Sequence, residues 1–398
     1  MRCIATKRVF DFIAEEQQRQ EDQINLIASE NFCSEDVMKA VGSCLTNKYA
    51  EGYPGHRYYG GCEVVDELEL YCQKKWQEAF NTDYFVNVQP HSGTQANEAV
   101  YYALLNPGDT VLSMSLDCGG HLSHFSPASI SGKLYNPVFY GLDEDGIIDY
   151  YDLSEKIRTH KPKLILAGAS SYSREIKFGL IKKIIDIEMS VDPDYHPIFM
   201  VDMAHIAGLI VGGEHVSPFG LADVITTTTH KTLRSTRGGM VFSRTEELAK
   251  KINSAVFPRN QGGPLMHAIA GKAVAAEEAC TEEYKEYISR VVLNTYTMCE
   301  QFKKMGYEIV SGGTDNHLFM IDLTNTHPNV TGKMVQDALE KKNIAVNKNC
   351  VPGDKRPPSE TSGIRIGCAA MTTKGFGPLD FIGCAIEIDE IIRGLNKK

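Results

Sequence analysis

The chain has 398 residues, and its 41 lysine and arginine residues against 51 aspartate and glutamate residues give a formal charge of −10. This acidic balance argues against nucleic acid or an anionic membrane as the main partner, because such partners are bound by clustered lysine and arginine. A composition of 42% hydrophobic and 23% charged residues is typical of a folded globular protein and not of a disordered chain.

The first 80 residues predict two helices on either side of an irregular segment. Val9, Phe10 and Ile13 recur at helical spacing, so we expect an exposed arm helix over residues 6–22. Residues 48–61 are rich in tyrosine and glycine and too irregular for a helix or strand. Apolar residues then recur every three to four positions between 64 and 80, which indicates an amphipathic helix.

Short apolar runs separated by helical stretches follow, a pattern typical of strands buried in a mainly parallel sheet. The expected strands of this sheet are 84–88, 110–114, 163–169, 198–201 and 223–227, with a helix over 95–105. A long helical region from about 264 to 305 precedes strand patterns at 307–310, 318–323, 344–346 and 364–366, with helices from Thr331 and Pro378. We therefore predict an α/β fold with an N-terminal arm (1–25), a large α/β domain (26–275) and a smaller C-terminal α+β domain (276–398).

Several other classes of protein are disfavoured by what the sequence lacks. No apolar run approaches the roughly 18 residues that span a bilayer, and the first residues lack the apolar core of a signal peptide. Eleven cysteines without a Cys-x-x-Cys pair fit neither a disulfide framework nor a zinc ribbon. His121 and His124 have no third ligand nearby in sequence, so no metal site is predicted. The Gly-rich dinucleotide and P-loop motifs are also missing. We expect a cytoplasmic protein with reduced thiols.

Ser92, Gly93 and Thr94 stand between a predicted strand and a predicted helix. Their hydroxyl and backbone N–H groups would meet at a helix N-terminus, which is a natural phosphate site. Seen alone, the same tripeptide is better explained as an ordinary helix cap.

Asp202 and Lys231 each follow a predicted buried strand, where open α/β sheets bind their ligands. Asp202 could pair with the protonated ring nitrogen of a pyridine cofactor, or simply cap the next turn. Lys231, poorly solvated at a strand end, could supply the neutral amine that bonds to an aldehyde, or extend to the surface. Together with the phosphate loop, in this order, they form the set that a pyridoxal phosphate enzyme needs.

Longer motifs resemble the serine hydroxymethyltransferase family from about Asp11 to the C-terminus. The segments that carry the resemblance are Leu26-Ile-Ala-Ser-Glu-Asn-Phe32, Asn47-Lys-Tyr-Ala-Glu-Gly-Tyr-Pro-Gly-His-Arg-Tyr-Tyr-Gly-Gly61, Val201-Asp-Met-Ala-His-Ile-Ala-Gly-Leu209, Thr226-Thr-Thr-Thr-His-Lys-Thr-Leu233, Gln261-Gly-Gly-Pro264 and Ser311-Gly-Gly-Thr-Asp-Asn-His-Leu318. The resemblance implies a fold-type-I pyridoxal phosphate transferase that moves the hydroxymethyl carbon of serine to tetrahydrofolate and leaves glycine. It also implies a homodimer, or a tetramer built from it, with active sites shared between subunits.

The resemblance assigns a role to each matching residue. The implied catalytic residues are Lys231, Glu51, Asp202, His121, Tyr59 and Thr228, with Glu51 as proton shuttle and His121 stacked on the cofactor. The implied cofactor-binding residues are Ser92, Gly93, Thr94, His121, Ser170, Asp202, His205, His230, Lys231, Tyr49 and Gly263. The substrate would be held by Ser34, Glu51, Tyr59, His205 and Arg365, and the folate by Glu51, Tyr58, Leu116, Gly120, Leu122 and Asn347. Tyr49, Glu51, Tyr59 and Gly263 are expected to reach the site of the neighbouring subunit.

The sequence departs from the family pattern at a few positions. Ser235 and Arg259 replace common glycines, which would add strain if either position needs a positive φ. Pro357-Pro-Ser359 stands where relatives carry another sequence, so the folate pocket is expected to differ. Cys118, Cys368 and Ala369 are also unusual. The alternatives left open are a folate-independent pyridoxal phosphate aldolase or transaminase, and a non-catalytic scaffold relative.

Overall fold

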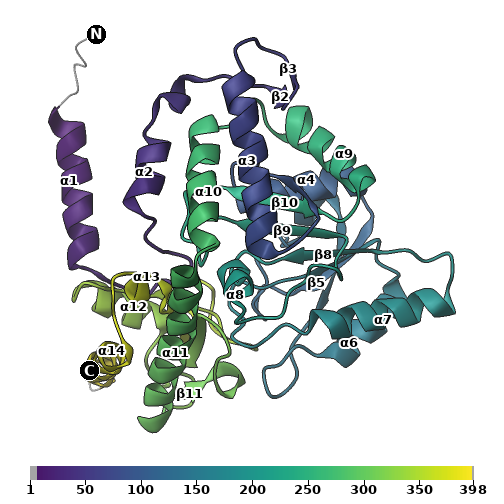
Figure 1. Ribbon diagram of the computed structural model, residues 1–398. Coiled ribbons are helices and arrows are strands. Elements are labelled where there is room, and N and C mark those ends of the chain that lie inside the picture. The colour runs from purple at the N-terminus through teal and green to yellow at the C-terminus, as the bar shows by residue number, and fades with distance from the viewer. Residues whose placement is uncertain (1–6, 397–398) are drawn as a thin grey trace.

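A seven-stranded sheet forms the centre of the larger part of the molecule in the computed structural model, which describes residues 7–396 (Figure 1). Its strands, in spatial order, are β4 (Phe85–Asn87), β10 (Gly239–Ser243), β9 (Val224–Thr228), β8 (Ile198–Asp202), β7 (Leu164–Ala167), β5 (Thr110–Met114) and β6 (Asn136–Tyr140). The strands β5 to β9 run parallel, whereas β10 is antiparallel to both β9 and β4. This confirms the predicted α/β fold with a mainly parallel mixed sheet. The sequence analysis did not predict β6 and β10.

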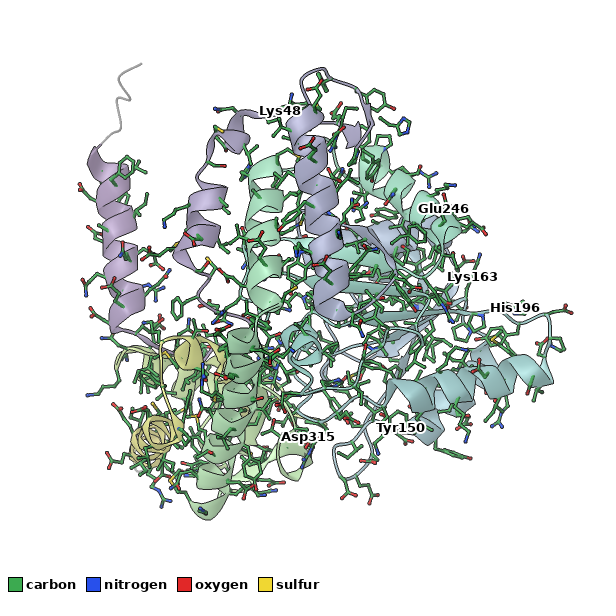
Figure 2. The ribbon with its side chains drawn as sticks, viewed as in Figure 1. Lys48, Tyr150, Lys163, His196, Glu246 and Asp315 are labelled. Carbon is green, nitrogen blue, oxygen red and sulfur yellow. The ribbon has the colours of Figure 1, made fainter. Side chains whose placement is uncertain are left out.

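Helices cover both faces of this sheet, which explains why its strands are apolar throughout. Ile165, Phe199 and Ile225 point to a core shared with α3 (Glu63–Phe80), α6 (Tyr150–His160), α7 (Phe178–Val191), α8 (Ala207–Gly212) and α10 (Met266–Ala279). The neighbouring residues Leu166 and Met200 point to the other face, under α4 (Gly93–Leu104) and α9 (Glu246–Ser254). Alternate residues of each strand therefore anchor opposite layers. Figure 2 shows charged side chains such as Lys163 and Glu246 at the periphery, where both are exposed.

A second, four-stranded antiparallel sheet lies in the C-terminal part of the chain. It contains β11 (Glu308–Ile309), β12 (Leu318–Asp322), β15 (Gly363–Gly367) and β14 (Asn347–Asn349) in that order. Its core includes residues of α12 (Gly332–Glu340), α13 (Ala369–Thr373) and α14 (Pro378–Leu395). The predicted strand at 344–346 is instead β13 (Ile344–Ala345), which pairs with β1 (Ile24–Asn25) outside this sheet.

The two cores are joined by α11 (Glu282–Lys304). Ile288 and Val291 pack in the first core, and Met298 and Phe302 in the second. The domain boundary expected at residue 275 stays a prediction. In the structure, α10 contributes to the first core as far as Ala279.

Two predicted segments differ in detail from the structure. The Tyr- and Gly-rich segment contains a short hairpin, β2 (Gly52–Tyr53) and β3 (His56–Arg57), whose turn includes Gly55 at φ +76°. The predicted long helical region is interrupted between α10 and α11, where the Thr281 side chain caps α11 by accepting a hydrogen bond from Tyr284 N.

The arm helix is confirmed as α1 (Lys7–Asp22), which stands apart from the other helices in Figure 1 and is exposed from Arg8 onward. Residues 1–6, which include the predicted start of this helix and the segment considered as a signal peptide, lie outside the residues that the structure describes. The remaining helices are α2 (Glu35–Val41) and α5 (Ile130–Leu134).

The residues from 7 to 396 include no helix that is long and apolar enough to cross a membrane. The same residues contain no group of three or more His, Cys, Asp and Glu side chains suited to a metal ion, and their ten cysteines are all free.

Candidate active site

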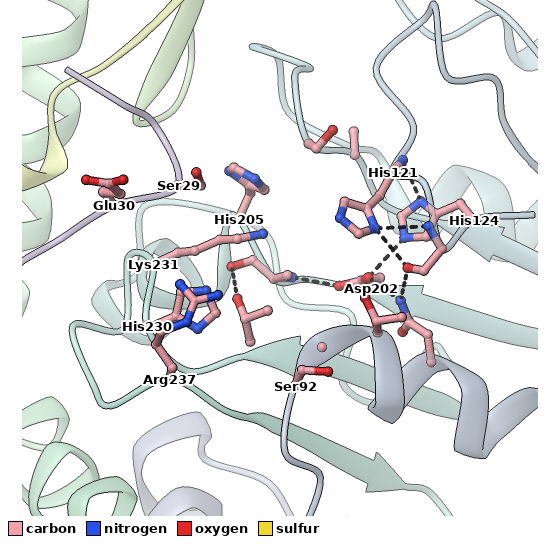
Figure 3. A pocket seen from close by; sticks show the side chains of 18 of the residues that line it. Ser29, Glu30, Ser92, His121, His124, Asp202, His205, His230, Lys231 and Arg237 are labelled. Carbon is pink, nitrogen blue, oxygen red and sulfur yellow. Dashed lines mark hydrogen bonds and ion pairs between the residues drawn. The ribbon is translucent and has the colours of Figure 1, made fainter. Parts of the chain in front are cut away.

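A pocket of about 380 Å³ opens where the carboxyl ends of β7, β8 and β9 meet the N-terminus of α4 (Figure 3). This is the edge at which open α/β sheets bind ligands. The pocket brings together eleven residues predicted from the sequence: Ser92, Gly93, Thr94, His121, Ser170, Asp202, His205, Thr228, His230, Lys231 and Arg365. Residues separated by more than 200 positions in the chain therefore share one cavity.

Asp202, the last residue of β8, is a buried carboxylate on the wall of this pocket. Its Oδ2 accepts hydrogen bonds from His124 Nε2 at 2.9 Å and Asn97 Nδ2 at 2.8 Å, and its Oδ1 accepts one from Ala204 N at 3.0 Å. Burial raises the pKa of Asp202, but these bonds and the nearby Lys231 charge outweigh burial and hold the pKa well below its usual range. The pocket therefore contains a fixed negative charge.

Lys231 follows β9, and its side chain is almost fully buried. Burial lowers the pKa of this amine to about 8, although the Asp202 carboxylate opposes the shift. Its Nζ has no hydrogen-bond partner among residues 7–396. A lysine with a lowered pKa and a free amine can act as a nucleophile toward an aldehyde at neutral pH.

The N-terminus of α4 provides an anion site in the same pocket. Ser92 caps the helix, and its side chain accepts a hydrogen bond from Gln95 N. A Cβ atom at Gly93 would lie 2.5 Å from Thr228 Cγ2, so only glycine allows the helix to begin so close to β9. His230 contributes a buried Nδ1 without a protein partner, and Arg237 contributes positive charge. These groups fit a phosphate.

His121 lines the pocket beside His124 and Asp202 (Figure 3). Burial lowers its pKa to about 4, so the ring is neutral at pH 7. Its Nδ1 accepts a hydrogen bond from Ser123 N at 3.1 Å, which fixes the ring's orientation. A neutral, fixed ring is suited to stacking on a flat cofactor.

Arg365, on β15, is partly buried, and its guanidinium is only partly satisfied by the protein. Its Nη1 donates to Ser170 O at 2.6 Å and its Nη2 to Asn347 Oδ1 at 2.9 Å. Its Nε is buried without a partner. Burial lowers the pKa of Arg365 to about 10, which leaves it charged at pH 7. The arrangement fits a carboxylate bound from the pocket.

Other predicted residues form a separate group in the same chain and do not line this pocket. Tyr49 Oη donates to Glu51 Oε1 at 3.2 Å, and the rings of Tyr49 and Tyr59 are 5.1 Å apart. Gly263 is also here, since a Cβ built on it would lie 3.5 Å from Glu51 Cγ. Tyr58 packs near Phe257.

Of the predicted folate residues, Gly120 and Asn347 contact residues of the pocket without lining it. Ser170 Oγ donates to Gly120 O at 3.1 Å, and Asn347 contacts Arg365. Leu116 and Leu122 are each about half exposed, at 50% and 51%.

Ser34, predicted to bind substrate, lies outside this pocket. The Ser34 side chain caps α2 by accepting a hydrogen bond from Val37 N, and it does not line the pocket. Ser29, in the motif Leu26-Ile-Ala-Ser-Glu-Asn-Phe32, lines it instead.

The sequence analysis also missed pocket residues whose role depends on distant partners. Asn97 lies one turn after the Ser92 cap, a position that could have been read as facing the pocket. The other missed lining residues are Glu30, Ser123, His124, Ala169, Ala204 and Arg237.

Near Lys231, the residue with a positive φ is Arg234 and not its neighbour Ser235. Neither Ser235 nor Arg259 has a positive φ, whereas Arg234 has φ +57°. Its guanidinium lies over the Tyr287 ring, 4.3 Å from the ring centroid. This contact gives Arg234 a favourable partner in an unfavourable backbone conformation.

Comparison with known proteins agrees with this geometry. A family model described as serine hydroxymethyltransferase matches residues 4–386. The serine hydroxymethyltransferase of Dichelobacter nodosus (strain VCS1703A) is 53% identical over 366 residues, which cover 92% of this chain and 85% of that relative. The chain therefore belongs to the serine hydroxymethyltransferase family.

Proposed function

We propose that this chain catalyses the reversible transfer of the serine hydroxymethyl carbon to tetrahydrofolate, giving glycine and methylenetetrahydrofolate, with pyridoxal phosphate as cofactor. One observation carries the proposal beyond family membership. A buried lysine with a lowered pKa shares a pocket with a fixed carboxylate, a phosphate-compatible helix N-terminus and a partly satisfied arginine.

The residues of the pocket fit the cofactor at three points. Lys231 would hold its aldehyde carbon, Asp202 its ring nitrogen, and the N-terminus of α4 with His230 and Arg237 its phosphate. When bound, pyridoxal phosphate supplies an electron sink for bonds at the amino acid's α-carbon. The unpartnered Nδ1 of His230 is an independent sign of this fit, because buried polar atoms in proteins are normally satisfied.

Asp202 acts through its charge. As an ionised, hydrogen-bonded carboxylate it would keep a proton on the cofactor's ring nitrogen, which strengthens the ring's capacity to accept electrons. His121 would orient the ring from one face, and Ser170 and His205 would lie near the phenolic oxygen.

Arg365 would bind and orient the substrate carboxylate. Because its two Nη atoms are already held by Ser170 and Asn347, the guanidinium is fixed before substrate arrives. Fixed donors lower the entropy cost of binding an anion. Ser29 takes the assisting place first assigned to Ser34.

The group around Glu51 supports a shared active site. Glu51, Tyr49, Tyr59 and Gly263 contact one another but not the pocket of their own chain. We propose a homodimer in which this group completes the partner's pocket, with Glu51 moving the proton between the substrate hydroxyl and the folate. Tyr58, Leu116, Gly120, Leu122 and Asn347 remain the proposed folate contacts, and the cytoplasm the proposed location.

The decisive experiment measures glycine formed from serine by the purified protein, with and without tetrahydrofolate. We expect fast glycine formation only with both cofactor and tetrahydrofolate. Equal turnover without folate would indicate a folate-independent aldolase or transaminase, and no turnover with bound cofactor would indicate a non-catalytic relative.

A further inference from the structure

His205 and His317 form a buried histidine pair at the edge of the pocket. Their rings are stacked, with centroids 5.3 Å apart and an angle of 30° between planes. His205 Nδ1 lies 3.1 Å from His317 Nε2. His205 lines the pocket, whereas His317, one residue before β12, is fully buried behind it.

Both rings are neutral at physiological pH. Burial lowers the pKa of His317 to about 3, and burial together with the Lys231 and Arg365 charges lowers the pKa of His205 well below its usual range. A neutral imidazole carries one proton, so one ring nitrogen donates and the other accepts. Across the single contact between the rings, one histidine must be the donor.

The other ring nitrogen of His317, Nδ1, shows which histidine donates the hydrogen bond between the rings. His317 Nδ1 is buried and has no partner among residues 7–396. A buried N–H without an acceptor is rarer in proteins than an unused acceptor, so Nδ1 carries no proton. The proton of His317 is then on Nε2 and is donated to His205 Nδ1. The proton of His205 must be on its own Nε2.

The Nε2 atom of His205 has no hydrogen bond to residues 7–396, and it is not among the buried atoms that lack a partner. It therefore faces the pocket, whose positive groups, Lys231 and Arg365, attract anionic oxygens. Figure 3 shows His205 beside Lys231 at this cavity. The backbone of His205 is held in place, since its carbonyl accepts a hydrogen bond from Thr232 Oγ1 at 2.9 Å.

We propose that His317 is a positioning residue that keeps the proton of His205 on Nε2, so that His205 offers a hydrogen-bond donor to an anionic oxygen in the pocket. The identity of that oxygen, substrate carboxylate or cofactor phenolate, rests on the proposed function; the protonation pattern does not.

Nitrogen NMR of histidine-labelled protein tests the pattern directly, with and without cofactor. The His205 signals are assigned by their loss in His205→Gln. We expect a protonated Nε2 and an unprotonated Nδ1 in His205. A proton on Nδ1 in the unmodified protein overturns the proposal, whether or not any variant folds.

Variants then test the coupling. In His317→Leu, the proton of His205 should be shared between Nδ1 and Nε2. Glycine binding to the cofactor-loaded protein should weaken by about threefold to tenfold, which corresponds to the loss of one hydrogen bond. His317→Gln can still donate at the position of Nε2 and should restore most of the affinity. His327→Gln, which removes a histidine in the C-terminal region away from the pocket, is the matched control and should change neither measurement.

The outcomes separate the two claims. The expected protonation in a protein that cleaves no serine would reject the proposed function and keep the inference. An unchanged His205 spectrum in a folded His317→Leu protein would reject the inference alone.

Discussion

His124 Nε2 meets Asp202 Oδ2 at 2.9 Å, and this contact keeps a buried carboxylate charged at the end of β8. The two residues are 78 positions apart in sequence. The same oxygen also accepts a bond from Asn97, so each donor of the pair comes from a different element around the pocket. The negative charge is therefore built into the folded chain before any ligand binds.

Asp202→Asn should weaken cofactor binding by one to two orders of magnitude, since a charge-assisted bond is worth about 1.5–3 kcal/mol. Equilibrium dialysis against pyridoxal phosphate measures this loss. His196→Asn, on the exposed surface, is a suitable control.

The same change should alter acid stability in a definite direction. The pKa of Asp202 is lowered by folding, so its carboxylate stabilises the fold above the unfolded pKa of about 3.9, and this stabilisation is lost as pH falls toward the folded value. The difference in unfolding free energy between the unmodified protein and Asp202→Asn should be constant from about pH 5 to 8 and shrink below about pH 4. A difference that grows on acidification would contradict the assigned charge.

Lys231 should react with the cofactor aldehyde in a pH-dependent way. Because burial lowers its pKa to about 8, the neutral amine fraction, and with it the rate of cofactor uptake by the apoprotein, should rise with pH and level off above about 8. Stopped-flow absorbance across pH 6 to 10 measures the rate. A rate that keeps climbing to pH 10 would mean that the reacting lysine is an ordinary exposed one.

Arg365→Lys should weaken glycine and serine binding by about tenfold to a hundredfold while cofactor affinity stays unchanged. An ammonium cannot reproduce the planar pair of donors, and its shorter reach abandons the contacts to Ser170 and Asn347. Titration of the cofactor-loaded protein with glycine gives the affinity. Arg356→Lys, in a loop with bonds to Val330 and Pro328 carbonyls, is the control. Equal affinities for Arg365→Lys and the unmodified protein would remove Arg365 from the substrate site.

The position of Glu51 predicts complementation between two inactive proteins. Lys231→Gln lacks the lysine and Glu51→Gln lacks the acid, so each homodimer should be inactive. In a hybrid dimer, one of the two pockets receives an intact Lys231 and an intact Glu51. Each hybrid dimer should therefore have about half the activity of an unmodified dimer. A hybrid shown to form by native mass measurement, yet inactive with serine and tetrahydrofolate, would place Glu51 in its own chain's site.

The central sheet could be predicted because its strands are short apolar runs buried on both faces. Ser92, Asp202 and Lys231 follow such runs, so their meeting at one sheet edge also followed from the pattern. The short antiparallel β10 was missed although Met240, Val241 and Phe242 form a similar buried apolar run.

Long-range contacts set the limit of what the sequence could predict. Ser29 and Ser34 are both serines in the segment before α2, and only the structure shows that Ser34 caps the helix. A lysine within α10 would be expected at the surface, yet Lys272 is fully buried and donates to the carbonyls of Val88, Pro90 and Gly239. Those acceptors lie just after β4 and at the start of β10, outside the helix that carries Lys272.

Borohydride reduction of the cofactor-loaded protein, followed by peptide mapping, shows which lysine holds the cofactor. Reduction fixes the cofactor to whichever lysine holds its aldehyde. We expect the label at Lys231 alone, and none on Lys231→Gln after reduction. A label at another lysine, or undiminished labelling of Lys231→Gln, would contradict this expectation.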